Sequence, residues 1–293
     1  MRTLVHLSDL HFGRLDERVV EPLRAQVEAS APDVIAVSGD LTQRARSEQF
    51  KAARAFLDTL PRVPLVVVPG NHDVPLYNVW ARFAQPLEKY RRYVTPDLEP
   101  FYADKEIAVL GLNTARSFTR KSGRVNRLQM ARIRERLCPH GDEITKVIVT
   151  HHPFDVPPGA DEREVVGRAR QAMETLAACG ADVLLAGHLH VSHTGQTAKR
   201  YRIRGHSALV VQAGTATSTR GRGEANSFNV LRLKHPYINV QRFAWAEAQR
   251  HFALASSEHF RHTPDGWVRL SDEVAAGLTY TAPGDALQPH VPA

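Results

Sequence analysis

The stretch Val34-Ile35-Ala36-Val37-Ser38-Gly39-Asp40 decides the fold that the sequence predicts. Its four consecutive apolar residues are typical of a strand with both faces covered, as in a sheet flanked by helices. The carboxylate of Asp40 follows directly after this strand and a glycine. Sites in α/β proteins assemble at the carboxyl ends of strands. The stretch therefore predicts an α/β protein and places Asp40 at its site.

Strand and helix patterns alternate on both sides of this stretch through most of the chain. Further strands are expected at residues 3–7, 65–68, 107–112, 146–150 and 182–186. Helices are expected at 16–29, 47–60, 126–137 and 162–178, and over part of 77–93. This alternation is typical of strand–helix–strand units within one α/β domain.

The pattern changes after His190. Strands are expected at 194–197, 200–203, 209–212, 227–233 and 237–243, with no helices between them. Consecutive strands of this kind predict antiparallel hairpins that complete a second sheet. We expect one domain over residues 1–245 and a C-terminal extension over 246–293, whose end at 282–293 is mobile.

The composition is that of an ordinary globular protein. With 293 residues, of which 43% are hydrophobic, the chain is long enough to bury one large core. No apolar run approaches the roughly 18–20 residues of a membrane span, and the polar N-terminus does not resemble a signal peptide. The two cysteines, Cys138 and Cys179, have no metal-type partners in the sequence around them. We expect reduced thiols and a cytoplasmic protein.

Polar residues gather where five of the predicted strands end. One such cluster alone would be weak, because short pairs of histidine and aspartate occur by chance in many proteins. Five clusters in succession at strand ends indicate one shared site. They contribute seven candidate metal ligands, which are Asp9, His11, Asp40, Asn71, His151, His188 and His190.

The residue types of these clusters indicate a site for two divalent metal ions. Carboxylate, imidazole and amide oxygen without thiolate favour Mn, Fe or Zn. Two such ions would polarise a phosphoryl oxygen and generate hydroxide at neutral pH. Their repulsion requires a carboxylate between them, and Asp40 is the expected bridge. With Asp9 and Asp40 ionised and hydroxide bound, the site would carry a charge of about +1, which favours a monoanionic diester over a monoester dianion.

The order of these clusters resembles that of the calcineurin-like metallophosphoesterases. The matching blocks are Asp9-x-His11, Gly39-Asp40, Gly70-Asn71-His72-Asp73, His151 and Gly187-His188-x-His190. Within that superfamily, the residues around the first three blocks are most similar to the bacterial class III cyclic-nucleotide phosphodiesterases. The resemblance implies a two-sheet, mixed α/β sandwich flanked by helices. It also implies hydrolysis of small phosphodiesters such as 3′,5′-cyclic nucleotides.

The resemblance assigns a role to each site residue. One metal would be held by Asp9, His11, Asp40 and His190, and the other by Asp40, Asn71, His151 and His188. His72 would contact the phosphate and stabilise or protonate the leaving oxygen; the alternative is a structural histidine paired with Asp73. Asp73 itself would orient the loop and support His11 or His72.

Two basic stretches lie close to predicted strand ends. Basic residues far outnumber acidic ones between Arg116 and Arg136, and a second basic stretch runs from Lys199 to Arg222. A solvated surface would explain both. The other explanation is a positive rim that attracts anionic substrate, because Asn113 ends a strand on the edge that carries the ligands. The candidate substrate contacts are Asn113, Arg116 and Arg220.

Other functions stay open at this point. Hydrolysis of a pyrophosphate in a nucleotide-linked lipid precursor would need an apolar groove, which the aromatic segment 74–102 could supply. The basic stretches allow a nucleic-acid-processing role, although aromatic residues for base stacking are sparse among them. A non-catalytic scaffold of this fold would be expected to lack site residues, and none is missing. A homo-oligomer is compatible with the sequence.

Overall fold

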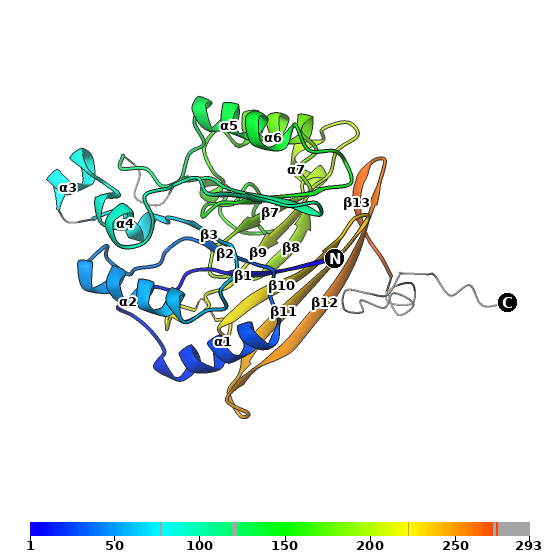
Figure 1. Cartoon of the computed structure of the whole chain (residues 1–293). Coiled ribbons are helices and arrows are strands. Elements are labelled where there is room, and N and C mark those ends of the chain that lie inside the picture. The colour runs from blue at the N-terminus through cyan, green and yellow to red at the C-terminus, as the bar shows by residue number, and fades with distance from the viewer. Residues whose placement is uncertain (77, 119–121, 222, 272–273, 275–293) are drawn as a thin grey trace.

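Two mixed sheets lie face to face in the computed structural model, and helices cover their outer faces (Figure 1). The structure describes residues 1–76, 78–118, 122–221, 223–271 and 274. Within those ranges, no helix combines the length and the apolar character that crossing a bilayer requires. The expected α/β sandwich flanked by helices is confirmed.

The first sheet contains seven strands in the order β13-β12-β11-β10-β1-β2-β3. Its parallel part consists of β1 (Arg2–Leu7), β2 (Val34–Ser38) and β3 (Leu65–Val68), connected by α1 (Glu17–Ala29) and α2 (Ser47–Asp58). The antiparallel part begins beside β1. It consists of β10 (Ser227–Lys234), β11 (Tyr237–Ala246), β12 (His251–Thr263) and β13 (Gly266–Arg269).

The second sheet contains six strands in the order β4-β5-β6-β7-β9-β8. These strands are β4 (Phe101–Ala103), β5 (Ile107–Gly111), β6 (Thr145–Val149), β7 (Val183–Ala186), β8 (His193–Gln196) and β9 (Leu209–Gln212). Its helices are α5 (Arg127–Leu137) and α6 (Ala169–Ala178). The short helices are α3 (Val79–Ala84), α4 (Glu88–Tyr93) and α7 (Ala198–Tyr201), with 3-10 turns η1 (Asn71–Asp73) and η2 (Glu162–Glu164).

Alternation along the strands builds three apolar layers. In β1, Leu4 packs between the two sheets, and Val5 packs on the opposite face with residues of α1 and α2. The same alternation in β6 sends Val147 between the sheets and Ile148 toward α5 and α6. Burial of both strand faces explains the continuous apolar runs in the sequence. Each fully buried aliphatic side chain contributes about 1.5–3 kcal/mol to the free energy of unfolding.

The second half of the chain differs from the prediction in how its strands pair. The strands after His190 do not complete one separate sheet: β8 and β9 join the second sheet, and β10 to β13 join the first beside β1. The predicted strand at 200–203 is wrong, because α7 ends there at Tyr201. The strands β12 and β13 were not expected, and the boundary proposed at residue 245 falls inside β11.

Some predictions concern residues outside the described part of the chain. These are the mobile end at 282–293, Tyr77 in the aromatic segment, and the basic residues Arg120, Lys121 and Arg222.

The prediction of two reduced cysteines is wrong. Cys138 and Cys179 form a disulfide, with a Cα–Cα distance of 4.4 Å. Each cysteine caps the C-terminus of a helix, Cys138 for α5 and Cys179 for α6. Both helices lead into neighbouring parallel strands of one sheet, so their C-termini meet although the cysteines are 41 residues apart in sequence. The tertiary arrangement of the two helices, and not the local sequence, decides this pairing.

The C-terminal hairpin is anchored by Trp267, which is 1% exposed and packs between the sheets. Its indole Nε1 donates to Asp182 Oδ1 at 2.8 Å, so β13 of the first sheet is tied to the residue that precedes β7 of the second. Burial raises the pKa of this carboxyl to about 6, while hydrogen bonds from the Lys146 amide and the indole oppose the shift.

Trp267→Ala should therefore destabilise the whole fold, with loss of about 3–5 kcal/mol of unfolding free energy as for other buried tryptophans. The measurement is urea denaturation followed by circular dichroism. Trp80→Ala is the matched control, because Trp80 is 72% exposed and its replacement should leave the midpoint unchanged. Equal midpoints for both variants, or a separate early transition in Trp267→Ala, would show that the hairpin is not part of the core.

Candidate metal centre

The candidate ligands lie in the loops that follow β1, β2, β3, β6 and β7, at one edge of the two sheets. Five of them adopt left-handed backbone conformations that are uncommon outside glycine. They are Asp9 (φ 52°), His11 (φ 49°), Asp40 (φ 52°), His188 (φ 72°) and His190 (φ 57°). Such conformations cost free energy and persist where the surrounding structure enforces them, as it does at functional sites.

Close approach of the loops requires glycine beside these residues. A Cβ atom on Gly70 would lie 2.1 Å from Asp40 Oδ1, and one on Gly187 would lie 1.8 Å from Ser8 Oγ. Both distances are far inside van der Waals contact, so any side chain would push the loops apart. The glycines of the sequence motifs therefore permit the loop after β3 to meet the loop after β2, and the loop after β7 to meet the loop after β1.

A first group of side chains consists of Asp9, His11, Asp40 and His190, all buried. His190 Nε2 lies 3.2 Å from Asp9 Oδ1, and His11 Nε2 lies 3.5 Å from the same oxygen. His11 Nε2 is also 3.7 Å from Asp40 Oδ2. Four ligand atoms therefore surround one position, as a divalent metal ion would require.

A second group forms around His151. Its Nε2 lies 3.0 Å from Asn71 Oδ1, 3.2 Å from His188 Nδ1 and 3.4 Å from Asp40 Oδ2. The Oδ2 atom of Asp40 thus faces imidazoles of both groups, while its Oδ1 accepts a hydrogen bond from the His72 amide at 2.8 Å. This is the position expected of a carboxylate that bridges two metal ions.

Hydrogen bonds orient three of the four ligand imidazoles. His151 Nδ1 bonds the Ser38 carbonyl at 2.8 Å, and His190 Nδ1 bonds the Arg220 carbonyl at 3.0 Å. His188 Nε2 lies 2.8 Å from Glu164 Oε2, which turns its Nδ1 toward the second group. Partners of this kind select the tautomer and raise the basicity of a metal-binding histidine. Glu164 was not predicted from the sequence, because it lies on the η2 turn with no motif around it.

Charge complementarity holds the two carboxylates in their ionised form. Burial would raise the pKa of Asp9, but His190, His11 and His151 outweigh it and hold that pKa well below its usual range. The pKa of Asp40 is lowered in the same way, chiefly by His151. Burial would lower the pKa of His151, but the Asp40 carboxylate outweighs it and raises that pKa to about 9.

These residues fit two divalent metal ions. Asp9 Oδ1 is buried and makes no well-directed hydrogen bond within the described part of the chain, since its neighbours are the imidazole nitrogens of His11 and His190. A divalent cation between this oxygen and the two imidazole nitrogens would satisfy all three, in place of the protons that the imidazoles share with it in the metal-free protein. Buried carboxylate, imidazole and amide oxygens together suit Mn, Fe or Zn.

His72 and Arg220 come together beside the first group. His72 Nδ1 bonds the Gln43 carbonyl at 2.9 Å, and Arg220 Nη1 lies 2.8 Å from His72 Nε2. The His72 ring meets the ring of His11 edge-on, with centroids 5.0 Å apart. His72 therefore does not pair with Asp73, the alternative weighed from the sequence. Asp73 instead accepts bonds from the amides of Leu41, Thr42 and Gly70, and so joins the loops after β2 and β3.

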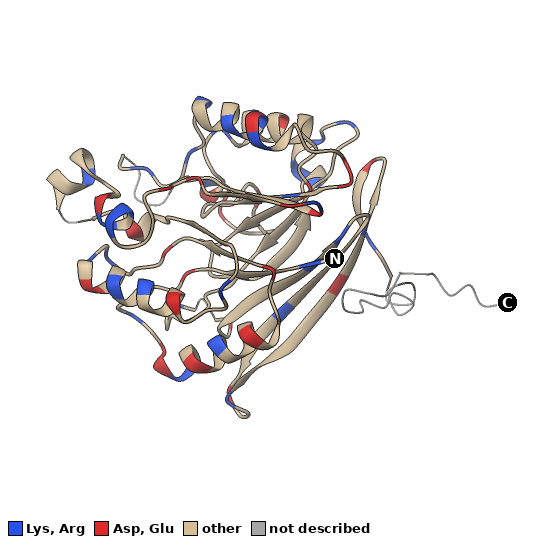
Figure 2. Cartoon of the chain, viewed as in Figure 1, with Lys and Arg blue, Asp and Glu red and all other residues tan. Residues whose placement is uncertain are grey.

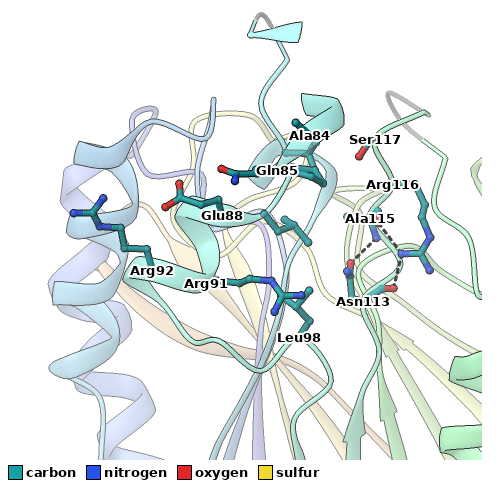
Figure 3. Close-up of a pocket in the computed structure, with 13 residues that line it drawn as sticks. Ala84, Gln85, Glu88, Arg91, Arg92, Leu98, Asn113, Ala115, Arg116 and Ser117 are labelled. Atoms are coloured by element: carbon teal, nitrogen blue, oxygen red, sulfur yellow. Dashed lines mark hydrogen bonds between the residues drawn. The ribbon is translucent and has the colours of Figure 1, made fainter. Parts of the chain in front are cut away.

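Two predicted substrate contacts, Asn113 and Arg116, lie outside the two ligand groups. Arg116 is turned into its own loop, where Nη1 donates to the carbonyls of Asn113 and Ala115, and Nη2 donates to Gln129 Oε1 at 2.8 Å. Asn113 Oδ1 accepts from the Ala115 amide at 3.0 Å. Both residues line a cavity between their own loop and the α3–α4 segment, and neither joins the two ligand groups (Figure 3). The local turn explains the direction of the Arg116 side chain, because its guanidinium donates to carbonyls that would otherwise lack a hydrogen-bond partner.

The family description of the calcineurin-like phosphoesterases matches residues 2–192. That is more than half of the chain, and the chain therefore belongs to the calcineurin-like phosphoesterase family. Among curated proteins, it is 39% identical over 83 residues to the glycerophosphodiester phosphodiesterase GpdQ of Enterobacter lignolyticus (strain SCF1). This match covers 24% of the chain and 29% of that relative.

Solved structures show the same fold. The purple acid phosphatase PPD1 from yellow lupin (Lupinus luteus) seeds matches with a TM-score of 0.68 and 11% identity, over 88% of this chain and 53% of that one. A dimetal phosphatase from Danio rerio matches with a TM-score of 0.59 and 12% identity, over 87% and 98% of the two chains.

Metal binding should release a proton from His151. Its pKa rises from the usual 6.5 to about 9 in the metal-free protein, so between these values the imidazole holds a proton that a metal ion must displace. Apparent metal affinity should thus increase with pH across this window and level off above it. Calorimetric titration with Mn²⁺ in buffers of different ionisation enthalpy measures the protons released. If the same number of protons is released at pH 7.5 and above pH 9, His151 does not hold the proton that the metal ion displaces.

Proposed function

We propose that this protein is a binuclear metal-dependent phosphodiesterase that hydrolyses small phosphodiesters such as 3′,5′-cyclic nucleotides. The observation that carries the proposal is the position of Asp40 Oδ2, which lies 3.7 Å from His11 Nε2 and 3.4 Å from His151 Nε2. One carboxylate oxygen thus faces two groups of ligands. The partial similarity to a glycerophosphodiester phosphodiesterase supports a diester as substrate.

Hydrolysis would depend on the metal ions and on two side chains, His72 and Arg220. Two bound divalent ions would polarise the phosphoryl oxygens and lower the pKa of water. Arg220, whose Nη1 lies 2.8 Å from His72 Nε2, would turn to a bound phosphate oxygen and donate hydrogen bonds to it. Water adds to phosphorus as the P–O ester bond breaks, and one proton of the water passes to solvent. His72 Nε2, released when the Arg220 guanidinium binds the phosphate, stabilises or protonates the departing alcohol oxygen.

The nucleic-acid alternative receives less support from the positions of the basic residues. Arg136 lies over the Phe101 ring, and Arg134 bonds the Thr175 hydroxyl. Arg200 pairs with Asp155 and Glu162. Lys and Arg are also interspersed with Asp and Glu over the helices (Figure 2), and such a mixed surface attracts a polyanion less than a continuous basic one does. These positions favour a small substrate.

Replacing Asp40 with alanine should remove metal and activity together, because neither group is complete without its carboxylate. We expect the wild-type protein, supplied with Mn²⁺, to hydrolyse members of a panel of cyclic mononucleotides, dinucleotides and glycerophosphodiesters. Metal content is measured by elemental analysis of dialysed protein. An Asp40→Ala variant with normal metal content and activity, or wild-type protein inactive on every diester, would overturn the proposal.

Replacing His72 with alanine should separate metal binding from turnover. Because His72 is not among the ligands, both metals should stay bound while kcat falls by about 10²–10⁴, as for loss of a general acid. The loss should be smaller for a 4-nitrophenyl ester, whose leaving group needs no proton. His251→Ala is the control, since His251 is exposed on β12. Equal losses on both kinds of ester would argue against proton donation.

A further inference from the structure

A cavity of about 750 Å³ lies between the α3–α4 segment and the loop after β5 (Figure 3). Its apolar walls are formed by Val74, Leu87, Leu98 and Ala115 together with Ala84 and Pro86. Pockets of this size and character bind small organic molecules. Nothing in the hydrolytic mechanism above uses this cavity.

Both sides of the cavity belong to segments that also build the metal centre. Val74 follows the η1 turn that carries Asn71 and His72. On the other side, Asn113 is followed by Thr114, whose hydroxyl lies 2.8 Å from His152 Nδ1, next to the candidate ligand His151. A phosphate held near Asn71 would therefore have this cavity beside it, within reach of one of its ester groups.

Arg91 is the cation that this cavity offers to a ligand. Figure 3 shows its side chain extended across the cavity toward the Asn113 loop. It bonds the Pro96 carbonyl at 3.3 Å and forms no ion pair with any residue whose placement is described. The other two arginines of the lining are less accessible to a ligand. Arg116 makes three hydrogen bonds to nearby residues, and Arg92 lies over the Tyr93 ring at 5.4 Å and points away from the Asn113 loop (Figure 3).

We propose that this cavity binds one ester group of the substrate and that Arg91 binds a second anionic group on it. The inference rests on the proposed phosphodiesterase function and narrows its substrate class. The preferred substrates are diesters with a bulky, largely apolar arm that ends in a phosphate, such as linear dinucleotides with a 5′-phosphate. A methyl or glycerol arm would leave most of the cavity unfilled, and a cyclic mononucleotide has no second anion for Arg91.

The test compares two substrates that differ only in the distal anion, the dinucleotide pApA and its analogue ApA without the 5′-phosphate. The wild-type enzyme with Mn²⁺ should have the higher kcat/KM on pApA. Arg91→Gln should lower that value on the order of 10- to 100-fold, as expected for loss of a charge-assisted hydrogen bond, and leave ApA unchanged. Lys89→Gln on the same helix is the matched control and should change neither, because Lys89 donates to the Ala45 carbonyl and does not line the cavity. Equal effects of Arg91→Gln on both substrates would overturn the assignment of Arg91.

A second pair of variants tests the cavity itself. Ala84 lines it and is exposed, so Ala84→Trp should fill the space without disturbing the core. We expect it to raise KM for both dinucleotides and to leave methyl 4-nitrophenyl phosphate unaffected, whereas Ala81→Trp on the same helix should affect none of them. If simple diesters are hydrolysed but dinucleotides are not, or if Ala84→Trp is silent, this inference fails and the proposed function stands. If the wild-type protein hydrolyses no diester at all, the proposed function itself is refuted.

Discussion

A carboxylate buried at the centre of a protein stays ionised only when positive charge surrounds it, and the loops of this protein are arranged around that constraint. Asp40 is 1% exposed, and the loops after β1, β3 and β6 each bring a polar group to it. His11 and His151 lie on either side of one oxygen, and the His72 amide binds the other. The left-handed backbone and the glycines beside it follow from this convergence.

Local signals explain why much of this could be predicted from the sequence. The apolar residues of Val34–Ser38 predict a buried strand. The glycine and carboxylate that follow predict where the strand ends and place a polar side chain at its carboxyl end. The seven candidate ligands all follow strands in this way, and the structure brings them into two adjoining groups. Family resemblance supplied what periodicity alone did not, namely that two sheets face each other.

The features that could not be predicted depend on contacts between distant segments. Strand β12 alternates poorly between buried and exposed residues, because its pairing with β11, and not an apolar face of its own, determines its place. Glu164 precedes His188 by 24 residues and becomes its partner only when η2 folds over the second sheet. Arg116 has the residue type of a substrate contact, but nearby carbonyls compete for its guanidinium.

The left-handed conformations at Asp9, His11, Asp40, His188 and His190 have a consequence for how the protein acquires its metals. Backbone geometry places these side chains, so the fold itself sets the arrangement of the candidate ligand atoms. A scaffold of this kind does not need to refold when one ion replaces another. Different divalent ions would then meet the same arrangement of ligand atoms, and selection between them would depend on the ligand types and on which ions the surroundings supply.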